Sequence, residues 1–206
     1  METSERFRQE HVLDGGQVIV LRHIQPSDAP ELRRAFRALS PETRYRRFFG
    51  AVTDLDDASL RYLTSVDGKD HVAIIATTDS LDLKTERGVG VARFVRSGNP
   101  HVAEAAVTVV DDMQRRGIGA HLTNALAQAA RERGVDNFRC EVLESNDVVV
   151  HALREAGATI VEQGGGVVVL DVPLVSTFGG VGRALRIAAE HVNAFLRRLL
   201  PPSSRH

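Results

Sequence analysis

Several residue types are almost missing from this sequence of 206 residues. Tryptophan is absent, only two tyrosines occur, and Cys140 is the single cysteine. One cysteine excludes an internal disulfide framework and a zinc site built on cysteine pairs. No apolar run approaches the roughly 20 residues that cross a bilayer. The polar residues Met1–Glu5 contain no signal-peptide core. We therefore expect a cytoplasmic protein without a membrane span.

An excess of charge of one sign is also lacking. The formal net charge is −1, so no overall basic surface favours nucleic acid, and we expect no nucleic-acid partner. Lysine is scarce, because only Lys69 and Lys84 occur among 26 basic residues. The length fits one medium domain with a sizeable core. We expect that domain at residues 16–175, preceded by an N-terminal extension (1–15) and followed by a C-terminal helical tail (176–206).

What is present is a strand, a glycine-bearing turn and a helix within Val107–Arg133. A helix N-terminus offers unpaired backbone N–H groups and a partial positive charge, which suit a phosphate. Gly117 and Gly119 would let a ligand approach the backbone closely. Arg115 and Arg116 add positive charge beside the turn. This stretch predicts an anion site, although a plain strand-to-helix turn is the simpler alternative.

The turn does not fit the two best-known phosphate loops. A Walker loop ends in Gly-Lys-Ser/Thr, whereas this turn carries Gly117-Ile118-Gly119. A dinucleotide-binding loop needs a third glycine three residues after the second, and Leu122 occupies that position. A nucleoside-triphosphate-binding protein is therefore a distant alternative.

The order of the expected elements predicts the fold class. We expect strands at 17–21, 71–77, 89–96, 102–110, 138–143, 158–162 and 167–172. We expect helices from Ser27, over 40–50, 56–63, 121–133 and 147–156. The helices interrupt an otherwise antiparallel series of strands, so the chain is mixed α/β (α+β) and not doubly wound.

The C-terminal tail has its own pattern. Apolar residues from Val181 to Leu199 alternate steps of four and three, which predicts an amphipathic helix with a heptad-like seam. Packing back onto the domain, self-association into a homo-oligomer, and contact with a membrane surface are the alternatives.

Glu104 stands out because an acid inside a strand is unfavourable. Side chains alternate along a strand, so Glu104 shares one face with Ala106, Thr108 and Val110. This carboxylate is either solvated at the edge of the sheet or aimed into a site.

These motifs resemble those of the GNAT superfamily of N-acetyltransferases. Gln114-x-x-Gly117-x-Gly119-Ala120, after a valine-rich strand and before an amphipathic helix, looks like the acyl-CoA pyrophosphate motif of that superfamily. Asn146, and a helix ending at Gly157-Ala158, resemble its second motif. The expected order of elements matches the GNAT order from about residue 16 to 172.

A narrower resemblance concerns GNAT domains of the bacterial protein lysine acetyltransferase (Pat) type. Leu39–Tyr45, followed by Phe48-Phe49, is similar to a segment common in those domains, as is Ala103–Val109. That class uses a glutamate at this strand position as a general base. The resemblance therefore implies that Glu104 is the catalytic base.

The resemblance implies a GNAT fold, with a mixed and mostly antiparallel sheet and a splayed parallel strand pair at the cofactor cleft. It implies acetyl-CoA as cofactor and direct transfer of the acetyl group to an amine, preferably a protein lysine. A small amine, a protein N-terminus, or a non-catalytic acyl-CoA-sensing role are the alternatives. The implied cofactor contacts are Val109, Val110, Gln114, Arg115, Arg116, Gly117, Ile118, Gly119, Ala120 and Asn146.

One departure from the family pattern concerns the general acid. Many GNAT enzymes carry a tyrosine on the helix after the asparagine, and the corresponding position here is about Leu153. No tyrosine lies on that helix, so no residue is assigned to protonate the leaving thiolate.

Weaker candidates have ordinary explanations. His151 could act as an acid or base, but a surface histidine is the simpler interpretation, and Cys140 fits a small core residue better than a nucleophile. Asp111-Asp112 near His121 could suggest a metal, but these acids also complement a helix N-terminus. The arginines at 44, 46 and 47 could face an acidic partner or a CoA phosphate, but they also suit a solvated basic face.

Overall fold

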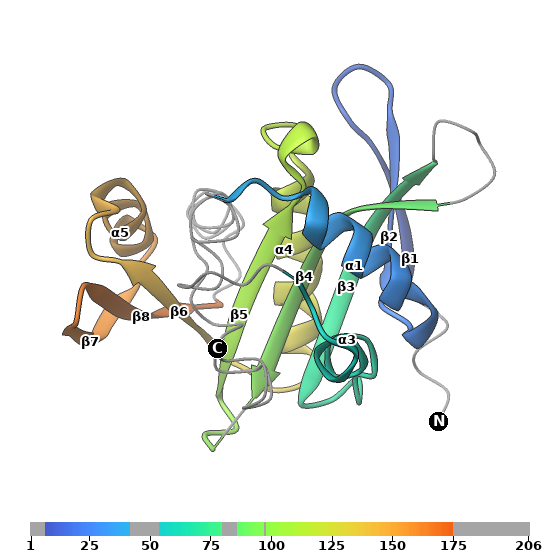
Figure 1. The fold of residues 1–206 in the computed structure, drawn as a ribbon. Coiled ribbons are helices and arrows are strands. Elements are labelled where there is room, and N and C mark those ends of the chain that lie inside the picture. Colours follow the sequence, from blue (N-terminus) through green and yellow to red (C-terminus); the bar gives the residue numbers. More distant parts are fainter. Residues whose placement is uncertain (1–6, 42–53, 80–85, 97, 175–206) are drawn as a thin grey trace.

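The structure is a computed structural model that describes residues 7–41, 54–79, 86–96 and 98–174 (Figure 1). The helix expected from Val181 onward lies outside the described residues, as do residues 42–50 of the helix expected over 40–50, including the arginine-rich segment 44–47. The self-association expected through the tail therefore stays a prediction.

The described elements follow the expected order closely. The strands are β1 (Arg8–Val12), β2 (Val18–His23), β3 (His71–Asp79), β4 (Glu86–Arg96), β5 (Val102–Val109), β6 (Asn137–Leu143), β7 (Thr159–Gly164) and β8 (Val167–Pro173). The helices are α1 (Ala29–Ala38), α3 (Asp57–Thr64), α4 (Ile118–Arg131) and α5 (Asp147–Glu155), with short 3-10 turns η1 (Pro26–Asp28) and η2 (Asp111–Met113).

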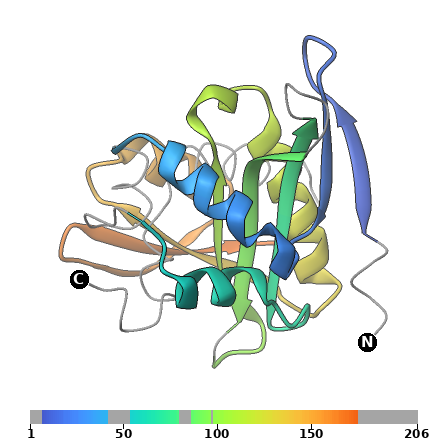
Figure 2. The ribbon, with the colours of Figure 1, turned by 45° about the vertical axis from the view of Figure 1, so that its right-hand side comes forward.

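The described strands form one sheet in the order β1-β2-β3-β4-β5-β6-β8-β7. Among them, only β5 and β6 are parallel, and every other neighbouring pair is antiparallel. Helices α1 and α3 cover one face of the sheet, and α4 covers the other (Figures 1 and 2). The expected mixed and mostly antiparallel architecture is confirmed.

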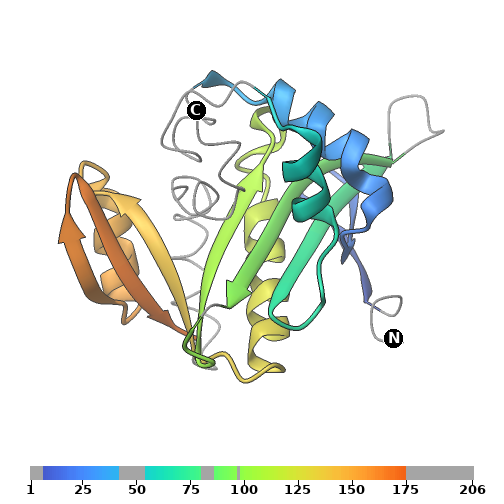
Figure 3. The ribbon, with the colours of Figure 1, turned by 60° about the horizontal axis from the view of Figure 1, so that its bottom comes forward.

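The parallel pair is short, and its two strands then separate. Strand β5 pairs with β6 only at Val102–Glu104, opposite Asn137–Arg139. Both strands continue beyond these pairs, to Val109 and to Leu143. Figure 3 shows them meeting at one end and diverging toward the other. The splayed strand pair expected from the family resemblance is therefore present.

Strand β1 lies within residues 8–12, which the sequence placed in an N-terminal extension. It pairs antiparallel with β2 at the edge of the sheet, across the Asp14-Gly15-Gly16 turn. Its sequence contains one apolar residue, Val12, which is 72% exposed. A two-residue alternation of apolar side chains is absent, so the pattern on which strand prediction relies could not reveal β1.

The middle of the sheet is buried from both sides, because helices cover both faces. In β3 every residue from His71 to Thr78 is buried. In β4, Phe94 and Arg93 are both at most 1% exposed. A charged side chain of β4 thus lies inside the molecule, and it borders the candidate site.

Candidate functional site

The turn before α4 has an unusual backbone. Gly117 precedes the helix with a φ of +85°, and Arg115 has a φ of +60°, a value that side-chain-bearing residues seldom adopt. Within the part of the chain that the structure describes, the N–H groups of residues 115–119 have no hydrogen-bond acceptor. Consecutive backbone N–H groups at such a turn form a concave cradle for an anion.

Gln114 holds this turn onto the end of β5. Its Nε2 donates to the carbonyl oxygen of Val109 at 3.1 Å and to Asp111 Oδ1 at 3.3 Å. The carboxylate of Asp111 also accepts from the backbone N–H of Ser40 at 2.7 Å. Gln114 and Asp111 therefore fix the shape of the turn, in addition to any contact they make with a ligand.

The two acids after β5 serve local structure. Asp112 pairs with Arg87 through both carboxylate oxygens, at 2.8 and 2.7 Å. Over the described ranges, no group of three His, Cys, Asp or Glu side chains is placed to hold a metal ion.

Several of the expected cofactor contacts can act only through their backbone. Val109, Val110 and Ile118 are at most 7% exposed, and their side chains belong to the hydrophobic core. Gly119 and Ala120 lie in the first turn of α4 and are half-buried. The exposed guanidinium groups of the turn come from two residues, Arg115 and Arg116.

Asn146 lies beyond the end of β6, the strand that diverges from β5. It precedes α5, and its carbonyl oxygen accepts from the N–H groups of Val149 and Val150 at 3.0 and 3.1 Å. Its half-buried side chain makes no capping hydrogen bond to this helix. The structure thus places Asn146 beyond the end of one diverging strand and the glycine turn beyond the end of the other.

Glu104 lies where the strands begin to separate. It is the last β5 residue paired with β6, opposite Arg139, and it faces Val95 of β4 on its other side. Its side chain is half-buried. The pKa of Arg139 is raised by its hydrogen bonds to Asp171 and, less strongly, by the charge of Glu104. Glu104 therefore lies where β5 and β6 begin to separate, close to the guanidinium of Arg139.

Three side chains near Glu104 were not anticipated from the sequence. Arg93 Nη1 lies 2.9 Å from His71 Nε2, and Arg93 Nη2 donates to the carbonyl oxygen of Leu63 at 2.9 Å. The ring of Tyr62 packs against His71, with ring centroids 5.0 Å apart. Arg93 is a charged residue inside the apolar run of β4. A charged residue inside an expected strand is also what drew attention to Glu104, so the same criterion could have identified Arg93.

Burial changes the proton affinity of this cluster. Loss of solvent lowers the pKa of His71 to about 4, assisted by the charge of Arg93, so its imidazole is neutral at pH 7. Burial also lowers the pKa of Arg93, to about 10, which leaves the guanidinium charged at neutral pH. Burial is the main cause that raises the pKa of the Tyr62 hydroxyl. The charge of Arg93 opposes this rise, and the charge of Glu104 adds to it. The His71–Arg93 contact is therefore one between a neutral acceptor and a cation.

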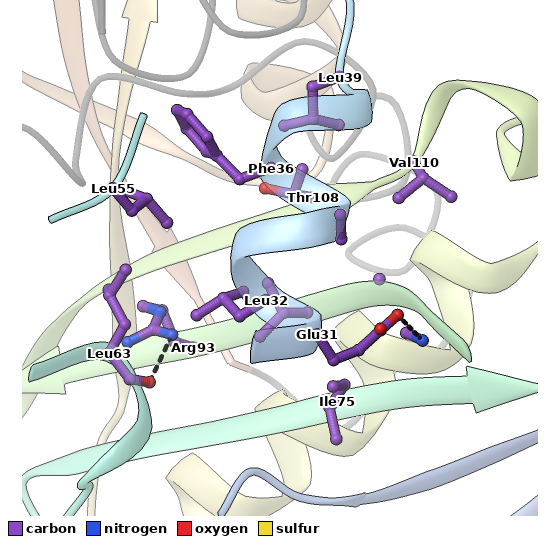
Figure 4. Close-up of a pocket in the computed structure, with 14 residues that line it drawn as sticks. Glu31, Leu32, Phe36, Leu39, Leu55, Leu63, Ile75, Arg93, Thr108 and Val110 are labelled. Atoms are coloured by element: carbon purple, nitrogen blue, oxygen red, sulfur yellow. Dashed lines mark hydrogen bonds between the residues drawn. The ribbon is translucent and has the colours of Figure 1, made fainter. Parts of the chain in front are cut away.

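A cavity of about 60 Å³ lies between α1 and the sheet, beside this cluster (Figure 4). Arg93 and Leu63 lie at one end, and Val110 lies at the other. Thr108 also borders it, so the cavity opens along the face of β5 that carries Glu104. Glu31 of α1 also borders the cavity, and the other side chains that line it are apolar: Leu32, Ala35, Phe36, Leu39, Leu55, Ile75 and Val91.

The weaker candidates have structural roles. Leu153, at the position where many GNAT enzymes carry tyrosine, is fully buried in the core. His151 is exposed and lies 3.2 Å from Glu155 on the same helix. Burial raises the pKa of the Cys140 thiol to about 12, which opposes thiolate formation. Helix α5 thus supplies neither a tyrosine nor a buried acid.

The sequence matches the profile of the Acetyltransferase (GNAT) family over residues 30–158. It is 38% identical over 165 residues to the acetyltransferase Pat of Mycolicibacterium smegmatis, covering 79% of this chain and 48% of that protein. It is 32% identical over 123 residues to the acetyltransferase PA5475 of Pseudomonas aeruginosa, covering 59% of this chain and 64% of that protein.

The fold matches a solved structure with the same family assignment. The GNAT domain of S. lividans PAT superposes with a TM-score of 0.72 and 29% sequence identity, covering 84% of this chain and 99% of that domain. The chain spans about half the length of the M. smegmatis protein and less than two thirds of the P. aeruginosa protein.

Proposed function

Since this chain belongs to the acetyltransferase (GNAT) family, a family of acyl-CoA-dependent N-acetyltransferases, we propose that it moves an acetyl group from acetyl-CoA to a primary amine. The acceptor in this proposal is a protein lysine, and the acetyl group passes directly from donor to acceptor within one complex with the enzyme. The geometry of the turn at residues 115–119 is the observation that carries this proposal, because it offers consecutive N–H groups beside two diverging strands.

The residues of the turn fit the donor. Backbone N–H groups at a helix start bind pyrophosphate oxygens, and Arg115 and Arg116 add charge from the exposed side. On the side of β5 that faces β6, pairing between the two strands ends at Glu104, so the pantetheine arm can lie along the backbone at Val109. Asn146 would contact the donor from the other diverging strand.

Glu104 is the proposed general base. A lysine amine with a pKa of about 10.4 requires on the order of 4.6 kcal/mol to lose its proton at pH 7. Glu104, directly or through one water, accepts that proton as the amine approaches the thioester carbonyl. The backbone N–H near Val109 then stabilises the developing negative charge on the carbonyl oxygen. The enzyme adds to this by holding the two reactants together.

Release of the thiol needs no dedicated acid from α5. Leu153 is apolar and buried, so it cannot protonate the leaving sulfur. A CoA thiol resembles a cysteine thiol, with a pKa of about 8.5, and its thiolate is an adequate leaving group at neutral pH.

A protein acceptor is supported by the similarity to Pat acetyltransferases. The same similarity favours an enzyme over a non-catalytic sensor. Acetylation profiling of a cell extract by mass spectrometry would distinguish modified lysines from modified N-termini, and an assay with free polyamines would detect a small-amine acceptor.

The central test compares Glu104→Gln with Glu162→Gln, an exposed strand glutamate on β7. We expect Glu104→Gln to lower kcat by about 10²–10⁴-fold while the affinity for acetyl-CoA, measured calorimetrically, stays unchanged. Glu162→Gln should alter neither quantity. Full turnover of Glu104→Gln would refute the base assignment, and no binding of acetyl-CoA at millimolar concentration would refute the donor.

A further inference from the structure

The cavity under α1 contains a buried positive charge that has no counter-ion among the residues that the structure describes. Arg93 is 1% exposed, and its two terminal nitrogens contact a neutral imidazole and a backbone carbonyl. Its Nε is buried and has no hydrogen-bond partner, and no carboxylate in the described part of the chain is bonded to the guanidinium. A buried charge without a partner is unfavourable, so this site favours an anion.

We propose that the cavity accepts an acyl chain that ends in a carboxylate, with Arg93 as its counter-ion. The proposal rests on the proposed use of an acyl-CoA donor and names the class of acyl group. Guanidinium and carboxylate are matched in charge and shape, and a guanidinium has five N–H donors to offer.

The position of the cavity supports an acyl chain as its occupant. Thr108 borders the cavity and adjoins Val109, whose backbone is proposed to contact the pantetheine arm. Arg93 lies opposite Ala106 on the neighbouring strand, two residues back from Thr108 along β5. A chain that enters beside Thr108 and follows this face of the sheet therefore reaches Arg93.

The size and lining of the cavity restrict the chain. About 60 Å³ is several times the space that one water needs, so a few carbon atoms fit. The walls between Thr108 and Arg93 are apolar and suit methylene groups. Glu31 also borders the cavity, but its carboxylate is already bonded to Arg34 and to the N–H of Gly88. Succinyl is a chain with these properties.

Calorimetric titration of the full chain with CoA, acetyl-CoA, butyryl-CoA and succinyl-CoA tests the proposal. Butyryl has the same number of carbons as succinyl but no charge, so it would leave Arg93 without an anion. We expect succinyl-CoA to bind at least about tenfold more tightly than butyryl-CoA. Equal affinities, or weaker binding of succinyl-CoA, would overturn the proposal. Failure of acetyl-CoA itself to bind would instead overturn the proposed function.

Two substitutions test whether a preference for succinyl-CoA over butyryl-CoA arises in this cavity. Arg93→Gln removes the charge but keeps an amide donor, and it should reduce the succinyl preference to about twofold or less. Ala35→Leu on α1 fills the cavity and should remove the preference even if Arg93→Gln does not fold. Ala38→Leu, on the exposed side of the same helix, is the matched control. A preference that survives either Arg93→Gln or Ala35→Leu in a folded protein would show that the chain binds elsewhere.

Discussion

Two charged side chains of the central sheet occupy positions where a strand normally carries apolar residues. Glu104 is half-buried at the point where β5 and β6 separate, and Arg93 is enclosed between the sheet and the helices α1 and α3. A charge in such a position is retained at a cost in stability, so it indicates a function. Both residues lie on the same face of the sheet, because Arg93 pairs with Ala106 and Glu104 lies two residues from Ala106 along β5.

His71 makes stability depend on pH. Burial lowers the pKa of its imidazole to about 4 in the folded protein, from 6.5 in the unfolded chain. The unfolded chain therefore takes up the proton first as pH falls. The contribution of the neutral His71 to the free energy of unfolding is fully present above pH 6.5. It is lost as the pH falls toward 4, by up to about 3 kcal/mol. Urea unfolding at pH 7.5 and 5.0 measures this loss.

His71→Gln keeps an acceptor for Arg93 but cannot titrate, so it should lose less stability between pH 7.5 and 5.0 than the native chain. His151→Gln, which replaces an exposed histidine on α5, is the control for the substitution itself. An identical loss in native protein and His71→Gln would assign the titration to another group.

Gly90 permits close contact between β4, β5 and α4. A Cβ at this position would lie 2.9 Å from the carbonyl oxygen of Thr108 and 2.9 Å from Leu122 Cδ1. The carbonyl belongs to a paired strand and cannot move aside. We expect Gly90→Ala to lower the free energy of unfolding by about 1–3 kcal/mol, measured by chemical denaturation.

Gly164 is the matched control, because it also lies in a strand and a Cβ there would meet nothing within 4 Å. Gly164→Ala should stay within about 0.5 kcal/mol of the native value. Equal stability of the two variants would mean that β4 and β5 adjust to the added methyl group.

At the scale of elements, the turn before α4 is held in a conformation that suits its proposed ligand. Gly117 has a φ of +85° and Gly166, in the β7–β8 turn, has a φ of +80°. Alanine at either position carries a similar backbone penalty of about 1–2 kcal/mol. We expect Gly117→Ala to weaken CoA binding by at least about tenfold and Gly166→Ala to leave it unchanged. Calorimetry with CoA measures both, and equal affinities would remove the turn from the binding site.

The elements predicted correctly are those whose pattern arises locally. The helix before Gly157 and the helix after Gly117 follow from apolar spacing and from their terminal glycines. The short helix expected over 56–63 is also present, and the Asp56 carboxylate caps it by accepting from the N–H of Ser59. Strand β1 was missed, because Arg8–Val12 offers almost no apolar alternation and is held by pairing with β2. Long-range pairing of this kind is not encoded in a short window of sequence.

In the candidate site, too, local patterns pointed to some residues, whereas others depend on long-range packing. The sequence singled out the glycine turn and Glu104 as candidates because their residue types are unusual for their expected elements. Arg93 was missed, because an arginine in an expected two-faced strand suggests a solvated side, and the sequence does not show that helices cover both faces of β4. The cavity likewise depends on how α1 lies across the sheet, which no local pattern specifies.

At the scale of the whole molecule, no helix among the described residues has the length and apolar character of a membrane span. The tail from Val181 lies outside the described residues, and self-association is one of the three alternatives that its heptad-like spacing leaves open. We expect removal of residues 180–206 to change the sedimentation coefficient by more than the lost mass explains, because a shared helical seam would be lost. Identical association states of the full and shortened chains would rule this out.

The brief pairing between β5 and β6 also has a consequence for folding cooperativity. Among the described residues, the ladder between β5 and β6 is limited to Val102–Glu104, so few backbone hydrogen bonds hold the part formed by β6, β8 and β7 to the rest of the sheet. We expect the amide hydrogens of this part to exchange fastest in the free protein and to be slowed by CoA, which would contact both parts. Ligand at about 100 times its Kd adds about 2.7 kcal/mol to stability. The cellular lifetime of this protein would then rise and fall with the supply of acyl-CoA.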